Sequence, residues 1–230
     1  MCKKDWLWNE MQQVGTDYAD ITQVEAYDAR MGAFRDVDGE NHEMLSLLGL
    51  PVGAAILEIG CGTGRFSRAA TAQGFTVTAI DVSPVMLDYV QHKAAAEGPG
   101  IITTLRAGFL TMDFPDNSFD AVVSGAALHH LPDLWKLVAL HNINRTLKSD
   151  GQFILRDVVF ALDNDEAPEC CFERFANFFP NMRKEAARHI AQEFSTYDWI
   201  MEGLLKRAGF DICSKTNSGE SFIVYHCTKQ

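Results

Sequence analysis

Short apolar runs alternate with longer amphipathic stretches through the middle of the chain. Residues 54–59 form an apolar run that ends at glycines, as a buried parallel strand does. The same reasoning predicts strands at residues 75–80, 101–106, 119–124 and 152–160, with helices between them at residues 63–73, 84–97 and 132–147. Repeated β-α units are connected by right-handed crossovers. We therefore expect an α/β protein with a doubly wound, mainly parallel sheet.

Two regions lie outside this repeat. Residues 1–50 are predicted to be helical, with residues 37–50 the most amphipathic part. Residues 161–196 interrupt the alternation, and Phe172, Phe175 and Phe179 share one face of a helix predicted there. That aromatic face indicates one of two roles. It is either a small core beneath a segment that runs over the surface, or the apolar wall of a lid over a ligand site.

The last part of the chain predicts one more helix and a hairpin. The helix is expected at residues 197–208, and the two strands after it are joined at Asn217-Ser218-Gly219, which is typical of an antiparallel edge hairpin. The complete expectation is one domain with a seven-stranded sheet. Its parts are an N-terminal helical cover at 1–50, a core at 51–160, an inserted helical lid at 161–196, and the C-terminal helix and hairpin at 197–230.

Composition agrees with one globular domain. Hydrophobic residues make up 47% and charged residues 22% of the 230 residues, which excludes disordered and fibrous proteins. The chain has 20 basic and 31 acidic residues, a net charge of −11. Because a nucleic-acid backbone is bound by a basic surface, this balance disfavours nucleic acid as the main partner. It does not decide between a monomer and a homodimer.

Neither a membrane span nor a disulfide framework is indicated. No apolar run approaches the roughly 18–20 residues that cross a bilayer, and the first residues contain no apolar segment of a secretory signal. The six cysteines are scattered and form no C-x-x-C pair, so we expect neither disulfides nor a metal site. The adjacent Cys170 and Cys171 are compatible with a site for a soft metal or metalloid, but ordinary packing in an aromatic segment is the favoured interpretation. The prediction is a reduced, cytoplasmic protein.

The residues with the clearest chemical meaning follow the first strand. Gly60, Gly62 and Gly64 lie where that strand turns into a helix, so the backbone there can approach a ligand closely. Asp81 ends the next strand, where a carboxylate can accept both hydroxyl groups of a ribose. Because residue 65 is arginine, the dinucleotide pattern G-x-G-x-x-G is not met. The turn is expected to serve a different nucleoside.

Several segments carry a family resemblance when they are taken together. They are residues 58–64 (EIGCGTG), 79–83 (AIDVS), 114–124 (FPDNSFDAVVS), 127–133 (ALHHLPD) and 203–210 (GLLKRAGF). This combination resembles the class I S-adenosylmethionine-dependent methyltransferases, in particular the small-molecule branch called types 11 and 25. The resemblance covers roughly residues 50–160 and 197–230. It implies a Rossmann-like fold and the transfer of a methyl group from S-adenosylmethionine.

The resemblance also implies roles for individual residues. The methionine part of the cofactor would be held by Glu58 and by the turn that contains Gly60, Cys61, Gly62 and Gly64. Asp81 would hold the ribose, and Val82 and Met86 would line the adenine. The sulfonium would lie over Ser124, Gly125 and Ala126. These assignments place the cofactor across the ends of the first, second and fourth strands.

Two further parts of the expected site are the contact with the adenine and the N-terminal cover of the cofactor. Relatives often have an acid before the fourth strand that contacts the adenine amino group, but Gly108 takes its place here. Backbone groups at Gly108 and Phe109, or a water, would have to replace that contact. Tyr27 and Arg30 resemble the N-terminal cover of relatives. Tyr27 also suits a cation–π contact with the sulfonium, or is simply a half-buried aromatic of a helix.

Methyl transfer is an in-line displacement that depends on alignment in a dry pocket. His129 and His130 follow the fourth strand, beside the expected methyl group, and either could contact the acceptor or take its proton. One of two adjacent histidines is often a structural hydrogen bonder instead. Asp157, near the end of the fifth strand, is a weaker candidate.

The acceptor is expected to be a small apolar or soft molecule, such as a thiol, a phenol or an amine. The pocket for it would be lined by Phe172, Phe175, Phe179 and Met182. One alternative is methylation of tRNA or protein. Its only local support is the basic cluster of Arg183, Lys184 and Arg188. A second alternative is a module that binds S-adenosylmethionine without catalysis.

Overall fold

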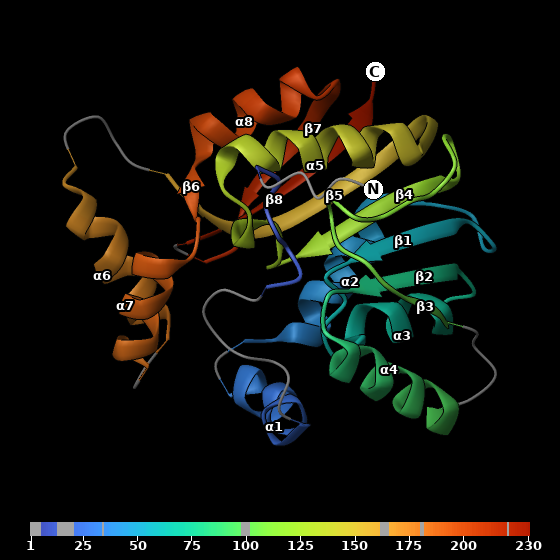
Figure 1. Ribbon diagram of the computed structural model, residues 1–230, viewed down its shortest axis with the longest axis horizontal. Coiled ribbons are helices and arrows are strands. Elements are labelled where there is room, and N and C mark those ends of the chain that lie inside the picture. Colours follow the sequence, from blue (N-terminus) through green and yellow to red (C-terminus); the bar gives the residue numbers. More distant parts are fainter. Residues whose placement is uncertain are drawn as a thin grey trace.

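One sheet organises the chain (Figure 1), and its central strands are parallel. The computed structural model describes residues 6–12, 21–33, 35–97, 102–161, 166–179, 182–219 and 221–230. The strands are β1 (Ala55–Ile59), β2 (Thr76–Asp81), β3 (Ile102–Arg106), β4 (Phe119–Gly125), β5 (Leu147–Phe160), β6 (Thr196–Tyr197), β7 (Phe210–Asn217) and β8 (Phe222–Lys229). Their order is β3-β2-β1-β4-β5-β8-β7, and the short β6 pairs with β5. Strand β8 runs antiparallel to both of its neighbours, β5 and β7. The predicted doubly wound sheet with an antiparallel hairpin is confirmed, and β6 is added to the seven strands expected.

Alternate residues of the strands face two different layers of helices (Figure 1). Ile56 packs with helices α2 (Val37–Leu48) and α3 (Arg65–Ala72), whereas Leu57 packs with helices α5 (Asp133–Thr146) and α8 (Asp198–Arg207). Helix α4 (Pro84–Glu97) covers β2 and β3. Each buried aliphatic side chain contributes about 1.5–3 kcal/mol, so this two-sided burial stabilises the sheet. None of the helices described here is long and apolar enough to cross a membrane.

The order of the strands reverses between β1 and β4. The chain leaves β1 toward β2 on one side and leaves β4 toward β5 on the other. Such a reversal opens a crevice at the carboxyl ends of the two strands, which is where α/β sheets bind ligands. Gly60 follows β1 at this edge, and the short 3-10 helix η1 (Leu128–His130) follows β4. The topology therefore places the glycine turn and both histidines at one edge.

The N-terminal region is only partly helical. Helix α1 (Ile21–Gly32) and α2 are present, but residues 6–12 form turns and bends. Aromatic contacts attach this short segment to the core: the ring centroids of Trp6 and Trp135 are 5.9 Å apart, and those of Trp8 and Phe194 are 5.3 Å apart. The prediction of a helical stretch over residues 1–50 is therefore corrected for residues 6–12, where packing of tryptophans replaces helical hydrogen bonds.

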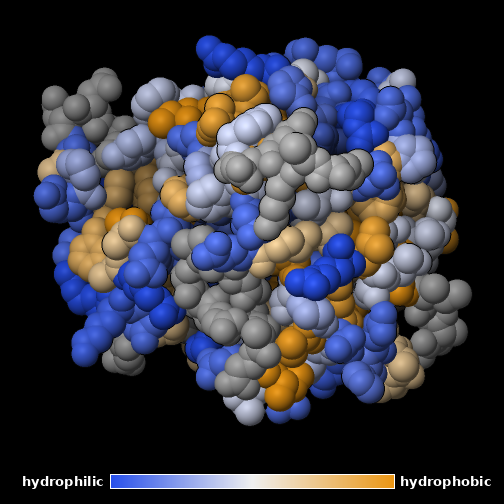
Figure 2. Space-filling model, in the orientation of Figure 1, coloured by the Kyte–Doolittle hydropathy of each residue, from blue (hydrophilic) through white to orange (hydrophobic). Residues whose placement is uncertain are grey.

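The inserted region contains two helices beyond the ends of β4 and β5 (Figure 1). They are α6 (Pro168–Phe178) and α7 (Arg183–Gln192). Their apolar residues, including Phe175 and Ala186, pack against Val158, Phe160 and Phe222 at the end of the sheet. Figure 2 shows apolar side chains that remain at the surface over α6 and α7, beside hydrophilic ones. The predicted aromatic face thus exists and joins the inserted helices to the core.

Strand β5 is longer than predicted. It begins at Leu147, before its expected start at residue 152, and Leu147 pairs with Phe119. The register between β4 and β5 shifts between Phe119 and Ala121, and Asp150 adopts a positive φ of 60°. The local irregularity absorbs the residues that the sequence assigned to a turn, so the strand continues through them.

Candidate active site

The glycine turn after β1 leaves room for a ligand. Gly60, Gly62 and Gly64 have φ values of 73°, 51° and 72°, in the left-handed region that favours glycine. A Cβ atom at Gly62 would have no heavy atom within 4 Å, whereas one at Gly60 would lie 2.4 Å from the Cβ of Ala127. The turn is therefore tightly packed against the β4–η1 connection on one side and open on the other.

Asp81 is fixed at the open side of this turn. Its Oδ2 accepts a hydrogen bond from the backbone N–H of Gly62 at 2.9 Å, and its Oδ1 accepts one from Ser83 at 2.8 Å. Burial raises the pKa of Asp81, while these backbone donors oppose the shift. The carboxylate is thus oriented before any ligand arrives.

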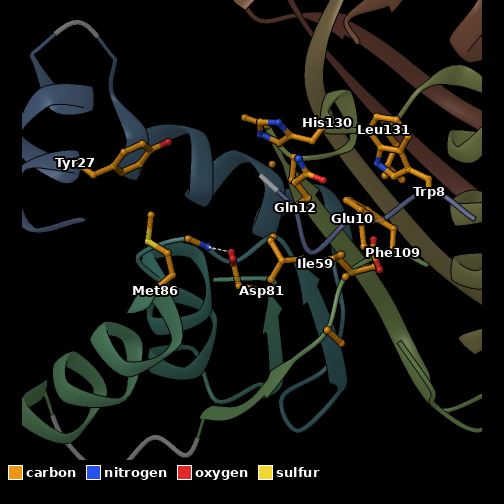
Figure 3. A pocket seen from close by; sticks show the side chains of 18 residues that line it. Trp8, Glu10, Gln12, Tyr27, Ile59, Asp81, Met86, Phe109, His130 and Leu131 are labelled. Carbon is orange, nitrogen blue, oxygen red and sulfur yellow. Dashed lines mark hydrogen bonds between the residues drawn. The ribbon is translucent and has the colours of Figure 1, made fainter. Parts of the chain in front are cut away.

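Most residues predicted to bind the cofactor line one cavity of about 140 Å³, named the cofactor cavity after that prediction (Figure 3). Tyr27 reaches in from α1 opposite Met86 and Asp81, Phe109 lies at the other end, and His130 lies between these two ends. The predicted residues along this cavity are Tyr27, Gly60, Gly62, Asp81, Val82, Met86, Gly108, Phe109, Gly125 and Ala126. The fold brings them together from α1, α4, the end of β2, the end of β4 and the turns that follow β1, β2, β3 and β4.

Five other predicted residues lie elsewhere. Glu58 and Cys61 line an adjoining cavity of about 100 Å³, which shares Tyr27, Gly60 and Gly62 with the first. Arg30 lines a third cavity. Gly64 and Ser124 line none of these three cavities: a Cβ at Gly64 would lie 2.7 Å from Val90, and the buried Ser124 hydroxyl donates to the carbonyl of Ile59. These two residues support the turn rather than border the cavities.

An acid that the sequence analysis missed borders the cofactor cavity at Gly108. Both carboxylate oxygens of Glu10 lie close to the backbone N–H of Leu110, at 2.9 and 3.0 Å. A Cβ atom at Gly108 would lie 2.5 Å from Glu10 Oε2, so only glycine leaves room for this carboxylate. Trp8 and Gln12 of the same segment line the cavity too (Figure 3). The hint in the sequence was the missing side chain at residue 108, but Glu10 and the Leu110 N–H that it accepts from are 100 residues apart.

The two adjacent histidines have different surroundings. His129 is buried; its Nδ1 lies 2.5 Å from Asp157 Oδ1, and its Nε2 lies 3.2 Å from Glu193 Oε2. Burial alone would lower the pKa of His129, but the two carboxylates raise it to about 9. His130 borders both the cofactor cavity and the third cavity, and burial together with the charge of His129 lowers its pKa to about 4.

The third cavity adjoins the cofactor cavity beneath α6 and α7. It has a volume of about 410 Å³, and it shares Tyr27, Ala126 and His130 with the cofactor cavity. Phe175, Phe179 and Met182 contribute apolar wall, and His129, His189 and Glu193 contribute polar wall. Of the aromatic residues predicted to line an acceptor pocket, Phe172 lies outside this lining and contacts the guanidinium of Arg183.

Comparisons with known proteins agree with this geometry. The model of the methyltransferase domain family matches residues 57–155. An uncharacterized methyltransferase of Geobacillus kaustophilus is 28% identical over 187 residues, covering 81% of this chain and 81% of the relative. Demethylmenaquinone methyltransferase of Bacillus licheniformis is 29% identical over 162 residues, covering 69% of this chain and 66% of that protein.

A solved structure shows the same fold. A SAM-dependent methyltransferase from Aquifex aeolicus superposes with a TM-score of 0.66 at 18% identity, covering 92% of this chain and 99% of that chain. These similarities support a class I S-adenosylmethionine-dependent methyltransferase. The methyltransferase is thus an enzyme with the Rossmann-like fold that the sequence implied, and the alternative of a non-catalytic module is set aside.

The residues of this methyltransferase fit S-adenosylmethionine at both ends. At the nucleoside end, Asp81 and the open space at Gly62 form a cradle. In the adjoining cavity, Arg156 is 2% exposed, and its Nε and Nη1 atoms have no hydrogen-bond partner among the described residues. Asn41 Nδ2, which lines the same cavity, likewise has none within the described part of the chain. Buried donors without partners are costly, and a ligand carboxylate would satisfy them.

Glu58 is expected to make the stability of the methyltransferase depend on pH. Burial raises the pKa of Glu58 from 4.5 to about 8, although a hydrogen bond from Ser67 favours the ionised form. Between these two pH values the unfolded chain releases the proton of Glu58 and the folded chain keeps it. The free energy of unfolding should therefore fall as the pH rises through this window, by at most about 1.4 kcal/mol per pH unit.

Urea denaturation at about pH 5.5 and about pH 7.5 measures this effect. The parent protein should lose more stability between the two conditions than Glu58→Gln, which cannot ionise. Glu43→Gln, on the exposed face of α2, should behave like the parent. Equal losses in all three proteins would show that Glu58 is ionised in the folded state.

Proposed function

We propose that this methyltransferase methylates a small molecule that binds in the cavity beneath α6 and α7. The observation that carries the proposal is the shared wall: Tyr27, Ala126 and His130 border both that cavity and the cofactor cavity. Bound S-adenosylmethionine supplies an electrophilic methyl group on a sulfonium. A molecule in the larger cavity would face it across these three residues. The demethylmenaquinone methyltransferase among the relatives supports a small-molecule acceptor.

Each part of the chain has a defined task in this proposal. Asp81 binds the ribose, Val82 and Met86 line the adenine, and the turn at residues 60–64 carries the methionine portion together with Glu58. Arg156 and Asn41 donate to the carboxylate of that portion. Gly125 and Ala126 lie beneath the sulfonium, above the supporting Ser124. Holding both partners in line supplies much of the rate enhancement.

The acceptor contact is assigned to His130 rather than His129. Both ring nitrogens of His129 are engaged by carboxylates, whereas the ring of His130 lies at the junction of the two cavities. The lid role of residues 161–196 belongs to the same proposal, because Phe175, Phe179 and Met182 exclude water from the reacting groups. Apolar walls favour an apolar or soft acceptor such as a thiol, a phenol or an amine.

The alternative of a tRNA or protein substrate has little support in the structure. Arg183, at the start of the basic cluster, pairs with Glu173 at 2.5 Å, so its charge is partly neutralised. The described cysteines are free: Cys61, Cys170, Cys171, Cys213 and Cys227. We therefore keep a reduced, cytoplasmic setting and a small-molecule partner as parts of the proposal, and a monomer and a homodimer are both compatible with it.

Turnover with labelled cofactor tests the proposed function. The full chain is incubated with methyl-labelled S-adenosylmethionine and a panel of thiols, phenols and amines, and released S-adenosylhomocysteine is measured. We expect product with at least one class of acceptor, and less product with Asp81→Ala when the cofactor concentration is below saturation. Label that enters only tRNA or protein fractions would contradict a small-molecule acceptor.

We further propose that Glu10 recognises the adenine amino group in place of the acid missing at residue 108. Glu10→Ala should lower the affinity for S-adenosylhomocysteine about tenfold, equivalent to about 1.4 kcal/mol, because a hydrogen bond to a charged group is lost. The parent should bind S-adenosylhomocysteine more tightly than S-inosylhomocysteine, which lacks the amino group. Glu10→Ala should lose that preference, as calorimetry with both ligands would show.

The control for this experiment is Glu25→Ala, on an exposed position of α1. It should retain both the affinity and the preference of the parent. If Glu10→Ala keeps the full preference for adenine over hypoxanthine, Glu10 serves only to dock residues 6–12, and the assignment is wrong.

A further inference from the structure

Four polar side chains from distant parts of the sequence meet at the wall of the larger cavity. His129 comes from η1, Asp157 from β5, His189 from α7, and Glu193 from the residue after α7 ends. Oε2 of Glu193 lies 2.6 Å from His189 Nδ1 and 3.2 Å from His129 Nε2. One carboxylate oxygen thus contacts a nitrogen of each of the two imidazole rings. The side chains of His129, His189 and Glu193 are largely shielded from solvent.

From this convergence we propose that His129, His189 and Glu193 bind a divalent first-row transition metal such as Zn²⁺. Their ligand atoms all lie within 4.8 Å of one another. Zinc bonds to imidazole and carboxylate are roughly 2.0–2.2 Å long, so tetrahedral ligands are about 3.3 Å apart. The distance of 3.2 Å from Glu193 Oε2 to His129 Nε2 is already close to this value, and the distance of 2.6 Å to His189 Nδ1 would have to lengthen by about 0.7 Å. This site replaces the expectation of no metal, which considered cysteine spacing alone.

The two imidazoles also have the outer partners that metal-binding histidines have. Nδ1 of His129 bonds to Asp157 at 2.5 Å, and Nε2 of His189 bonds to Ser195 Oγ at 2.9 Å. Each ring is thereby oriented with its other nitrogen toward Glu193. Such outer partners set the tautomer and the direction of a metal ligand. The backbone N–H of Phe194 donates to the carbonyl of His129 at 2.8 Å, which holds the end of α7 against η1.

The charges at this point favour a divalent cation. Asp157 and Glu193 place two carboxylates around His129, and a protonated His129 balances only one of them. Lys136 is nearby, but it pairs with Asp133 at 2.8 Å. Arg188 and Glu185 line the same cavity with opposite charges. A divalent ion would balance both carboxylates while leaving the imidazoles neutral, the form in which they bind metals.

The cluster leaves one side open. Three protein ligands with a further position for water or substrate is the arrangement of catalytic zinc sites. Here the ligands themselves line the 410 Å³ cavity, so the open position would face the space that the proposed function gives to the acceptor. The metal site itself stands without that assignment, because it rests only on these side chains.

Metal titration of the full chain tests the site. After treatment with a chelator, the protein is titrated with Zn²⁺ by calorimetry and with Co²⁺ by visible absorption. We expect one ion per chain. Glu193→Gln and His189→Ala should abolish binding at micromolar metal, and Ser195→Ala, which removes only an outer partner, should weaken it about 10- to 100-fold. His141→Ala, on an exposed position of α5, is the matched control and should bind like the parent.

Two checks make the result decisive. The Co²⁺ spectrum of the parent should lack the intense sulfur charge-transfer bands that thiolate ligands such as Cys170 or Cys171 would produce. Each variant should bind S-adenosylhomocysteine like the parent, which shows that it is folded, since these residues do not line the cofactor cavity. No ion bound, or binding that is unchanged in Glu193→Gln and His189→Ala, would overturn the metal site and leave the proposed methyl transfer untouched.

Discussion

Replacing Asp81 by alanine should weaken the binding of S-adenosylmethionine by about 1–3 kcal/mol, or roughly 5- to 150-fold. The carboxylate accepts hydrogen bonds from the N–H groups of Gly62 and Ser83, which aim it into the cavity where the ribose would lie. Alanine removes both the acceptors for the ribose and the link between two turns. Isothermal calorimetry with S-adenosylmethionine measures the change directly.

The matched control for Asp81 is Asp88→Ala, which removes an exposed carboxylate from α4. It should leave the affinity unchanged. Asp81→Asn should fall between the parent and Asp81→Ala, because the amide oxygen can still accept one hydrogen bond. If Asp81→Ala binds the cofactor as tightly as the parent, the ribose is not held at the end of β2 and the placement of the whole cofactor fails.

Gly60→Ala should destabilise the fold and remove cofactor binding. Alanine at a φ of 73° costs about 1–2 kcal/mol from the left-handed conformation alone. The added Cβ would also lie 2.4 Å from the Cβ of Ala127, so the end of β1 and the β4–η1 connection must move apart. Both border the cofactor cavity. Chemical denaturation should show a loss greater than the conformational cost, and calorimetry should show no binding at micromolar cofactor.

A control and a rescue separate the two causes. Gly53→Ala has a φ of 89° and no heavy atom within 4 Å of the added Cβ, so it should lose only the conformational part. In Gly60→Ala combined with Ala127→Gly, the clashing methyl group is absent, and binding should return in part. Equal losses for Gly60→Ala and Gly53→Ala would mean that the close contact with Ala127 has no energetic consequence.

Features that depend on neighbouring residues were predictable from the sequence. The apolar run before Gly60, the acid that ends β2, and the Ser83-Pro84 start of α4 each express a local rule of strand burial or helix capping. The same holds for the hairpin at residues 217–219. The glycine turn could therefore be placed at the correct strand end, and Tyr27, Met86 and Phe109 do border one cavity with Asp81.

Features that join distant residues were not predictable in this way. Glu10 contacts the backbone of Leu110 across 100 residues through a segment that is not helical, and no periodicity links the two residues. His189 and Glu193 are four residues apart at the end of α7, a spacing that the sequence does show, but nothing local indicates that both face His129. Arg156 is a charged residue inside a run read as a buried strand, and its partner Glu40 lies 116 residues away.

The sequence by itself therefore determined the class of fold and the edge of the sheet that carries the glycine turn and Asp81. Those properties follow from local backbone preferences and from the two-residue period of buried strands. Only the tertiary structure decided which side chains complete the edge: a carboxylate from residues 6–12 at the adenine end, and a histidine–carboxylate cluster at the larger cavity. Long-range packing brings these groups together, and a buried charge is stable only where such packing supplies its partner.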